Sequence, residues 1–203
     1  MAPTPTRSLT SQVDTPGGPA RVHLHPAKPA RLALVLGHGA GGGVEAPDLV
    51  VAAETALAAG VTVALVEQPY RIAGRRSPPP APRLDEAWVA VVKQLAAGPL
   101  AGLPLLAGGR SSGARVACRT AEATGARGVL CLAFPLIAPS GASRLAELDA
   151  VRVPTLVVQG TRDRFGMPPS GPRRVVVEVS ADHALKSDRA AIAAAIAGWL
   201  AAQ

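Results

Sequence analysis

A serine between two glycines has the residue types and the spacing that nucleophilic chemistry requires. Residues 109–113 spell Gly-Arg-Ser-Ser-Gly, a G-x-S-x-G pattern, between an apolar run and a helical segment. In that context Gly109 and Gly113 permit a strand-to-helix turn too tight for side chains, and the turn exposes the central hydroxyl at a helix N-terminus. The free N–H groups and the dipole of the helix then face the oxyanion that forms during attack. The pattern predicts Ser111 as a nucleophile and Ser112 as a backbone N–H donor.

Both serines have an alternative interpretation. Ser111 could be an ordinary helix N-cap, because serine is a preferred residue at that position. Ser112 could be the nucleophile only if the pattern shifted by one residue, which would put Arg110 and Ala114 at the flanking positions. Arg110 is too large for such a turn, so Ser111 is favoured.

A serine hydroxyl is a weak nucleophile until a base takes its proton, so the pattern also requires a histidine held by a carboxylate. Asp163 follows one later apolar run and His183 follows the next, which gives the chain order Ser, Asp, His. Asp163 could instead be a turn residue paired with Arg162 or Arg164. Its rival, Asp182, is an immediate neighbour of the histidine on a loop and cannot readily reach the same imidazole edge. We therefore predict Asp163 as the acid and His183 as the base.

A second N–H donor for the oxyanion is expected from the segment that begins at His38. This segment follows the first buried apolar run and continues as Gly39, Ala40 and Gly41. It is similar to the glycine-rich loop that supplies an oxyanion hole in lipases and esterases. We predict Ala40, or a glycine beside it, as the donor. His38 is expected to shape the loop through a hydrogen bond rather than to act as a base.

Several basic residues follow the same expected strands. We predict a substrate rim that includes His38, Arg71 and Arg110, and arginines at this rim could attract an anionic substrate. The Arg- and Pro-rich segment 71–83 is equally consistent with a solvated, stiff loop. His23 and His25 alternate on one expected edge strand, but the other ligands of a metal site are missing there.

The intervening elements predict the scaffold that positions these residues. Short apolar runs alternate with helical segments, which is typical of a mostly parallel sheet covered by helices on both faces, a doubly wound α/β domain. About six to seven strands are expected, at residues 21–25, 32–36, 61–66, 104–107, 128–134, 155–159 and 174–179. Helices are expected at 47–59, 84–97, 112–124 and 187–201, with a short one near 143–149. In such sheets ligands bind at the carboxyl ends of the strands, where the predicted site residues lie.

Length and composition indicate one domain. A chain of 203 residues with 48% hydrophobic and 17% charged residues has enough apolar material for one core. Only 2% of the residues are aromatic, so aliphatic side chains must fill that core. The Pro- and Gly-containing segment 1–19 is predicted to be a flexible N-terminal tail. Residues 20–203 are predicted to form a single domain.

Several classes of partner are disfavoured. The net charge is +7, but the basic residues are scattered and aromatic rings for stacking on bases are few, so nucleic acid is not an expected partner. No apolar stretch reaches the length of a membrane span, and no secretory signal is visible, so a cytoplasmic protein is expected. Cys118 and Cys131 have no metal-binding spacing and are expected to be small buried hydrophobes. We expect no metal or organic cofactor, and either a monomer or a homodimer.

Three motifs together resemble a known family. Residues 37–41 match a GHGAG loop, residues 108–115 a GGRSxGxR elbow, and residues 159–166 a QGxxDxFG acid loop. The chain resembles the small α/β-hydrolases without a lid, of the dienelactone-hydrolase-like kind, over residues 20–202. The resemblance implies the α/β-hydrolase fold and the triad of Ser111, Asp163 and His183. Larger relatives insert a lid between Phe134 and Val153, where this chain has room only for a short helix, so an open, shallow site is expected.

We therefore expect a serine hydrolase that acts on small carboxylic esters or thioesters through an acyl-enzyme. The alternative is a catalytically idle binding module that keeps the fold and contacts an acidic partner. A third possibility is transfer of the acyl group to an acceptor other than water. The reactivity of Ser111 distinguishes the serine hydrolase from the binding module.

Overall fold

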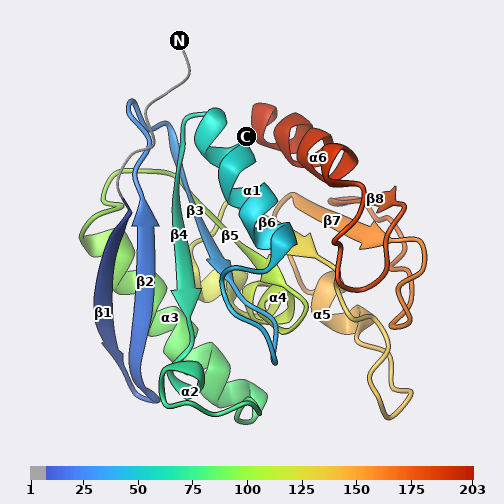
Figure 1. Ribbon diagram of the computed structural model, residues 1–203, viewed down its shortest axis with the longest axis horizontal. Coiled ribbons are helices and arrows are strands. Elements are labelled where there is room, and N and C mark those ends of the chain that lie inside the picture. The colour runs from blue at the N-terminus through green and yellow to red at the C-terminus, as the bar shows by residue number, and fades with distance from the viewer. Residues whose placement is uncertain (1–7) are drawn as a thin grey trace.

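A sheet of eight strands forms the centre of the protein, and the computed structural model describes residues 8–203 of it (Figure 1). The strand order is β1-β2-β4-β3-β5-β6-β7-β8. The first two pairs in this order are antiparallel and all the others are parallel. The strands are β1 (Leu9–Thr15), β2 (Gly18–His25), β3 (Leu32–Gly37), β4 (Val61–Glu67), β5 (Leu105–Arg110), β6 (Gly128–Leu132), β7 (Thr155–Gly160) and β8 (Arg174–Val179). The predicted mostly parallel α/β sheet is confirmed.

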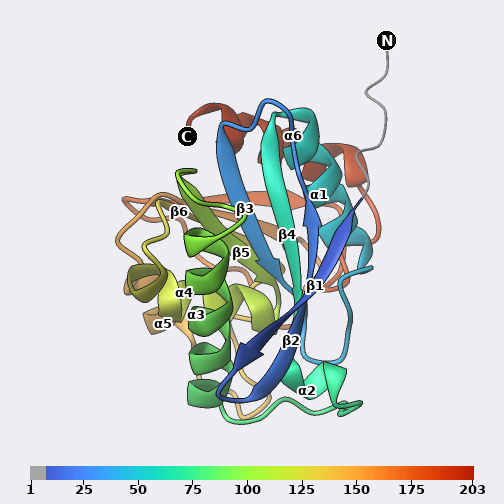
Figure 2. The same cartoon turned by 90° about the vertical axis from the view of Figure 1, so that its left-hand side faces the viewer.

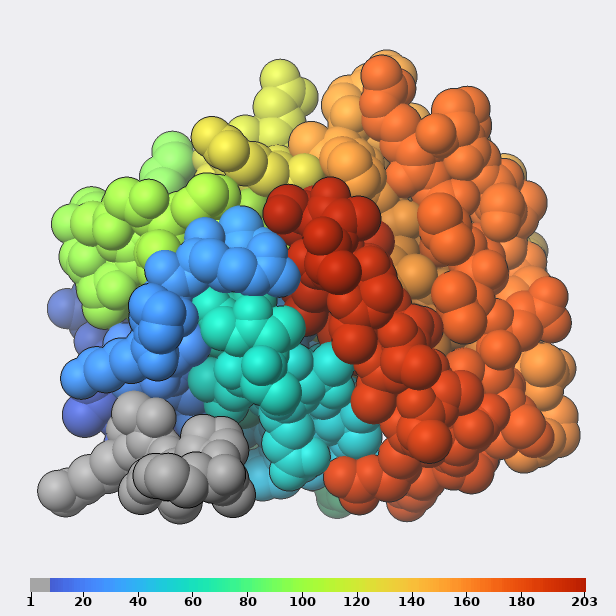
Figure 3. Space-filling view, turned by 90° about the horizontal axis from the view of Figure 1, so that it is seen from above, coloured from blue at the N-terminus to red at the C-terminus, as the bar shows by residue number. Residues whose placement is uncertain are grey.

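Helices cover both faces of this sheet. Side chains of α1 and α6 pack in one apolar cluster, and those of α3, α4 and α5 pack in another on the opposite face (Figure 2). Figure 3 shows α6 lying beside α1. The helices are α1 (Pro47–Ala58), α2 (Pro69–Ile72), α3 (Ala81–Ala97), α4 (Ser112–Thr124), α5 (Leu145–Asp149) and α6 (Arg189–Ala201).

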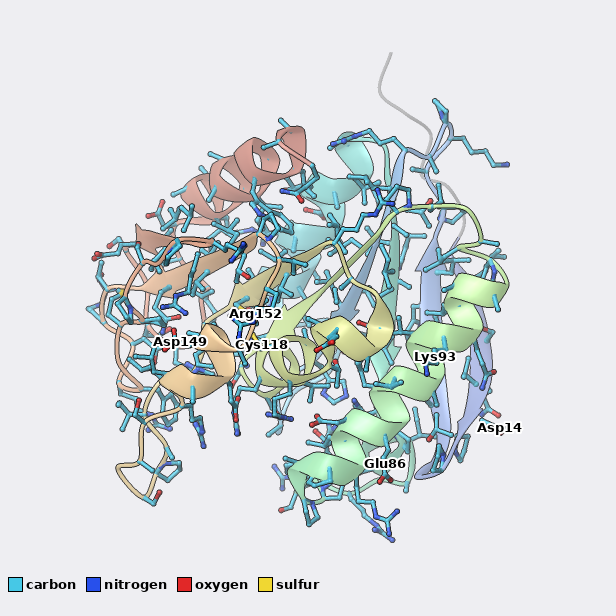
Figure 4. All side chains as sticks on the ribbon, turned by 180° about the vertical axis from the view of Figure 1, so that it is seen from behind. Asp14, Glu86, Lys93, Cys118, Asp149 and Arg152 are labelled. Atoms are coloured by element: carbon cyan, nitrogen blue, oxygen red, sulfur yellow. The ribbon has the colours of Figure 1, made fainter. Side chains whose placement is uncertain are left out.

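Helix α3 illustrates why these segments are helical. Leu84, Trp88 and Val91 recur at helical spacing and are buried, whereas Glu86 and Lys93 are exposed on the outer face of the helix (Figure 4). An apolar stripe of this width packs one side of the helix on the sheet and leaves the other side in water. The same arrangement places the helix next to α4, β1 and β2.

The core is aliphatic, as the composition predicts. The residues of β3 and β6 are buried along their whole length, which is expected for strands covered on both faces. Trp88 and Phe134 are the large aromatic residues among the fully buried side chains. Cys118 and Cys131 are free and buried, with their sulfur atoms 3.5 Å apart, which agrees with their predicted role as small hydrophobes.

The flexible tail predicted for residues 1–19 is wrong for the part that the structure describes. Residues 9–15 form β1, which pairs antiparallel with β2, and residues 1–7 lie outside the described residues. Val13 is the one buried side chain of this strand, so there was no apolar alternation to detect. The strand is held instead by ladder hydrogen bonds and by Gln94 Nε2, which donates to the Asp14 carbonyl at 2.9 Å. The sheet consequently has one strand more than expected.

Within residues 8–203, no helix has both the length and the apolar character needed to cross a membrane.

Candidate active site

Ser111 lies on a sharp turn between β5 and α4. Its backbone has φ 52° and ψ −109°, a conformation that is unusual for a residue with a side chain. The turn is anchored by the Ser111 N–H, which donates to the Leu132 carbonyl at 2.9 Å. A Cβ at Gly109 would lie 2.5 Å from the Gly37 carbonyl oxygen, and a Cβ at Gly113 would collide with the same carbonyl. The two glycines are therefore required by the close approach of β3, as the pattern predicts.

The structure brings His183 and Asp163 to this serine. The distance from His183 Nε2 to Ser111 Oγ is 3.0 Å, and the distance from His183 Nδ1 to Asp163 Oδ2 is 2.8 Å. Because a carboxylate only accepts hydrogen bonds, the proton of the imidazole lies on Nδ1. Nε2 is then free to accept from the hydroxyl. The three side chains come from three different loops at the carboxyl edge of the sheet, where the sequence predicted them.

The carboxylate of Asp163 is completely buried and fully engaged. Its Oδ1 accepts from the Phe165 N–H at 2.9 Å, and its Oδ2 accepts from Gln159 Nε2 at 2.9 Å in addition to the imidazole. Asp182 is exposed, and its Oδ1 accepts from the Ala184 N–H, so it is a turn residue. The structure thus brings Asp163, and not its rival, to the histidine.

Two residues that contact Asp163 and His183 were not predicted as site residues. Gln159 is fully buried at the end of β7 and its Nε2 also lies 2.9 Å from the Gly166 carbonyl, so it ties the acid loop together. A buried glutamine at the end of an apolar strand is the signal that could have identified it. The ring of Phe165 meets the His183 ring edge to face at 4.6 Å, and Arg164 lies 4.8 Å above the ring of Phe165. Nothing in the local spacing predicts that stack.

His38 orients the loop that follows β3. Its Nδ1 lies 2.8 Å from the Gly39 carbonyl, and its Nε2 accepts from the Gln68 N–H at 3.0 Å. The carbonyl of Gly39 and the N–H of Ala40 belong to one trans peptide, so holding the carbonyl aims this N–H in the opposite direction. Burial lowers the pKa of His38. The ring is thus a neutral donor to the loop, and the hydrogen-bonding role predicted for it is supported by these contacts.

Tyr70 holds the next peptide of the same loop, and the sequence did not predict a role for it. Its hydroxyl donates to the Ala40 carbonyl at 2.8 Å, which fixes the orientation of the Gly41 N–H. Burial raises the pKa of Tyr70 to about 12, so the phenol remains a donor at neutral pH. Among residues 8–203, the N–H groups of Ala40, Gly41 and Ser112 have no acceptor. They are available to an incoming oxygen atom.

Two of the predicted rim residues face inward, which corrects that prediction. His38 is only 3% exposed, because the loop folds over it. The Arg110 side chain contacts Asp48 at the start of α1 and donates from Nη2 to the His183 carbonyl at 3.0 Å. Arg71 is half-buried on α2 and its Nη1 donates to the Arg75 carbonyl, so its place at a rim stays a prediction.

In the described part of the chain, no three His, Cys, Asp or Glu side chains are grouped so that they could hold a metal ion. His23 instead contacts the Glu67 carboxylate at 2.7 Å on the surface between β2 and β4.

A hydroxyl held on a strained turn at the carboxyl edge of a mostly parallel sheet is the feature that defines α/β-hydrolase proteins. A family model described as an alpha/beta hydrolase domain matches residues 30–190. The chain therefore belongs to the alpha/beta hydrolase domain family.

Solved structures share this fold over almost the whole chain. XC6422 from Xanthomonas campestris, described as an α/β serine hydrolase without a lid, matches with 21% identity and a TM-score of 0.78, covering 98% of each chain. Est1E from Butyrivibrio proteoclasticus matches with 16% identity and a TM-score of 0.77, covering 96% of this chain and 99% of that one. The dienelactone hydrolase from Anabaena variabilis matches with 18% identity and a TM-score of 0.77, covering 98% and 99%. A search of curated protein sequences finds no match.

Proposed function

We propose that the protein is a serine hydrolase that cleaves small carboxylic esters or thioesters. The observation that carries this proposal is the pair of contacts made by His183, whose Nε2 lies 3.0 Å from Ser111 Oγ while Nδ1 lies 2.8 Å from Asp163. A hydroxyl within hydrogen-bond distance of a base, with that base oriented by a carboxylate, is the arrangement that activates a serine.

The acylation step follows from these contacts. Ser111 Oγ attacks the substrate carbonyl carbon while its proton passes to His183 Nε2, and a new C–O bond forms. Asp163 stabilises the imidazolium that results. The negative charge on the substrate oxygen is stabilised by the backbone N–H of Ser112 and by that of Ala40, in the loop held by His38. His183 then returns the proton to the departing alkoxide or thiolate, and the acyl group remains on Ser111.

Deacylation repeats these roles with water. His183 takes a proton from the water molecule, whose oxygen attacks the acyl carbon, and the same N–H groups stabilise the charge. Collapse of this intermediate releases a carboxylic acid and returns the proton to Ser111. Every proton is carried by His183, so we propose a mechanism that uses no metal or organic cofactor.

The surroundings of the site support small substrates. The segment between β6 and β7 contains one five-residue helix, α5, where a lid would otherwise be accommodated. An uncovered site favours short acyl groups over long lipid chains, which need a deep apolar pocket. Est1E, which shares the fold, has been solved with ferulic acid bound, and ferulic acid is itself a small carboxylic acid. We propose small carboxylic acids as products here too.

The scarcity of aromatic residues supports a small molecule rather than nucleic acid as the partner. We also propose that the protein acts in the cytoplasm, as a monomer or a homodimer. Sedimentation analysis distinguishes these two states.

Labelling with a fluorophosphonate probe tests the proposal, because the probe reports an activated serine without requiring the natural substrate. We expect the wild type to be labelled and Ser111→Ala to be unlabelled while still folded. Ser112→Ala is the matched control and should retain labelling, since its backbone N–H is unchanged. A folded wild type that is not labelled would contradict the proposal and favour a binding module. Hydrolysis of a series of short acyl esters and thioesters then defines the acyl group.

A further inference from the structure

Arg110, the residue directly before Ser111, connects three of the loops at the site. Its Nη2 donates to the His183 carbonyl at 3.0 Å, and its Nε lies 2.9 Å from Asp48 Oδ2. Its Nη1 packs so closely on Gly39 that a Cβ there would lie 2.8 Å away. One guanidinium thereby contacts the loop of the base, the loop expected to hold the oxyanion, and the start of α1.

The Asp48 carboxylate is the anchor of this arrangement. Its side chain is completely buried, and that of Arg110 is 17% exposed. Oδ1 accepts from the Leu49 N–H at 3.0 Å, which fixes the carboxylate in the first turn of α1. Burial raises the pKa of Asp48 to about 6, while the nearby charge of Arg110 opposes this rise. A buried carboxylate needs a charged partner, so Arg110 is held in place from this side.

We propose that Arg110 is a positioning residue, whose guanidinium sets the distance of the His183 loop and of the Gly39 loop from Ser111. The expected effect on rate rests on the proposed function, because these distances change a rate only if Ser111 reacts. The planar fork of a guanidinium can contact separate groups in fixed directions, whereas the ammonium of a lysine is a single compact charge.

The size of the effect follows from the geometry of attack. A displacement of about 1 Å between reacting groups can cost about 100-fold in rate. The contacts of the Arg110 guanidinium are with protein groups, the His183 carbonyl, Asp48 and Gly39, so its loss should lower kcat and leave KM nearly unchanged.

Arg110→Lys is the decisive variant, because it keeps a positive charge beside Asp48 and removes the fork. We expect kcat and the rate of fluorophosphonate labelling to fall about 10- to 100-fold, with KM changed by less than about threefold. In Arg110→Ala, added guanidinium ion at low concentration should restore part of the lost rate.

Arg119 on α4 supplies the matched control. Its side chain is 19% exposed and its guanidinium pairs with Asp85 and Glu147, away from the site. Arg119→Lys therefore removes a fork of similar burial, and we expect the labelling rate to stay at the wild-type value. Equal losses in Arg110→Lys and Arg119→Lys would overturn the proposal, as would an unchanged rate in folded Arg110→Lys.

A second measurement separates this inference from the proposed hydrolysis. The proton that His183 Nδ1 shares with Asp163 should give a low-field proton resonance in the wild type and in Arg119→Lys. We expect Arg110→Lys to lose or broaden it, because the loop of the base is no longer held. If the wild type is not labelled but this pattern is found, the proposed hydrolysis fails and the positioning role stands. The same resonance in wild type and Arg110→Lys would overturn the role of Arg110, as would its absence from the wild type.

Discussion

The loops that follow β3 and β8 each carry a histidine whose Nδ1 lies 2.8 Å from an oxygen atom. The two histidines differ in the partner of Nε2 and in their exposure to solvent. Nε2 of His38 accepts from the Gln68 N–H, whereas Nε2 of His183 faces the hydroxyl of Ser111. His38 is 3% exposed, while the side chain of His183 is 20% exposed. Both nitrogen atoms of the His38 ring are paired with backbone groups, whereas Nε2 of His183 is paired with the predicted nucleophile.

The difference teaches that the partner of Nε2 decides what a histidine can do. To take a proton, His38 would have to give up the Gln68 N–H, which would be left buried without an acceptor. Burial lowers the pKa of His38 and opposes protonation further. Both residues are therefore expected to affect the reaction, His183 by moving a proton and His38 by holding a peptide.

The largest effect should come from His183→Ala. We expect hydrolysis and fluorophosphonate labelling to fall by about 10⁴-fold or more, because no other group can take the proton of Ser111. The fold should persist, since the side chain lies partly in solvent. His25→Ala, which alters a half-buried histidine on β2, is the control and should behave as wild type. A rate for His183→Ala close to wild type would remove the distinction between the two loops.

Substitution of His38 should have an intermediate effect that depends on which nitrogen is replaced. His38→Phe removes both hydrogen bonds, and we expect kcat to fall about 100-fold, as when an oxyanion donor is misplaced. His38→Asn can keep the donor to the Gly39 carbonyl, so it should retain more activity than the Phe variant. Both should be less stable by about 1–3 kcal/mol in urea unfolding, because the Gln68 N–H loses its acceptor. Equal activities in the two variants would contradict the proposed role of the Gly39 contact.

Tyr70→Phe alters the same loop as the His38 variants, and its effect on activity should be smaller. The variant removes one hydroxyl and its hydrogen bond to the Ala40 carbonyl, and it keeps the packing of the ring. We expect a loss of about 1 kcal/mol in stability and a decrease of about 3- to 10-fold in kcat. Steady-state kinetics on an activated short-chain ester measures it. An unchanged kcat would show that the loop is held without Tyr70.

The smallest predicted signal is a titration of His38 that is displaced to lower pH. Since burial lowers the pKa of His38, its ring should titrate at a lower pH than an ordinary histidine, which nitrogen NMR of the ring reports directly. The ring of the unfolded chain binds a proton below its ordinary pKa of about 6.5, whereas the ring of the folded chain binds one only at lower pH. The contribution of His38 therefore lowers the free energy of unfolding as the pH falls below about 6.5. His38→Asn should lack this dependence. A ring of His38 that titrates at or above the pH of an ordinary histidine would contradict the assignment.

The sequence was sufficient for the strands from β2 to β8 and for the residues that contact Ser111. Apolar runs, glycines at the turn and the order Ser, Asp, His are local signals, and the fold needs each of them where it occurs. The strand β1 left no such signal, because Val13 is its only buried side chain and its stability comes from pairing with β2.

The supporting contacts could not be predicted for a different reason. Arg110 and Tyr70 act through partners that lie far away in the chain, and residue type alone does not select the partner. An arginine beside the nucleophile therefore suggested a rim, although its ion pair with Asp48 turns it inward. Burial and pairing of charged groups are properties of the tertiary structure.

The short segment between β6 and α5 also has a use in protein engineering. It is closed by the bridge between Ile137 and Ser143 and by the Ala138 N–H, which donates to the Ala142 carbonyl at 2.9 Å, and residues 139–143 are exposed (Figure 1). Each doubling of a loop costs only about 0.6 kcal/mol in closure entropy. Extra residues inserted at 140–141 would disturb no buried side chain. This tip is therefore a site for grafting a cap, by which acyl-chain preference could be altered while the reacting groups stay as they are.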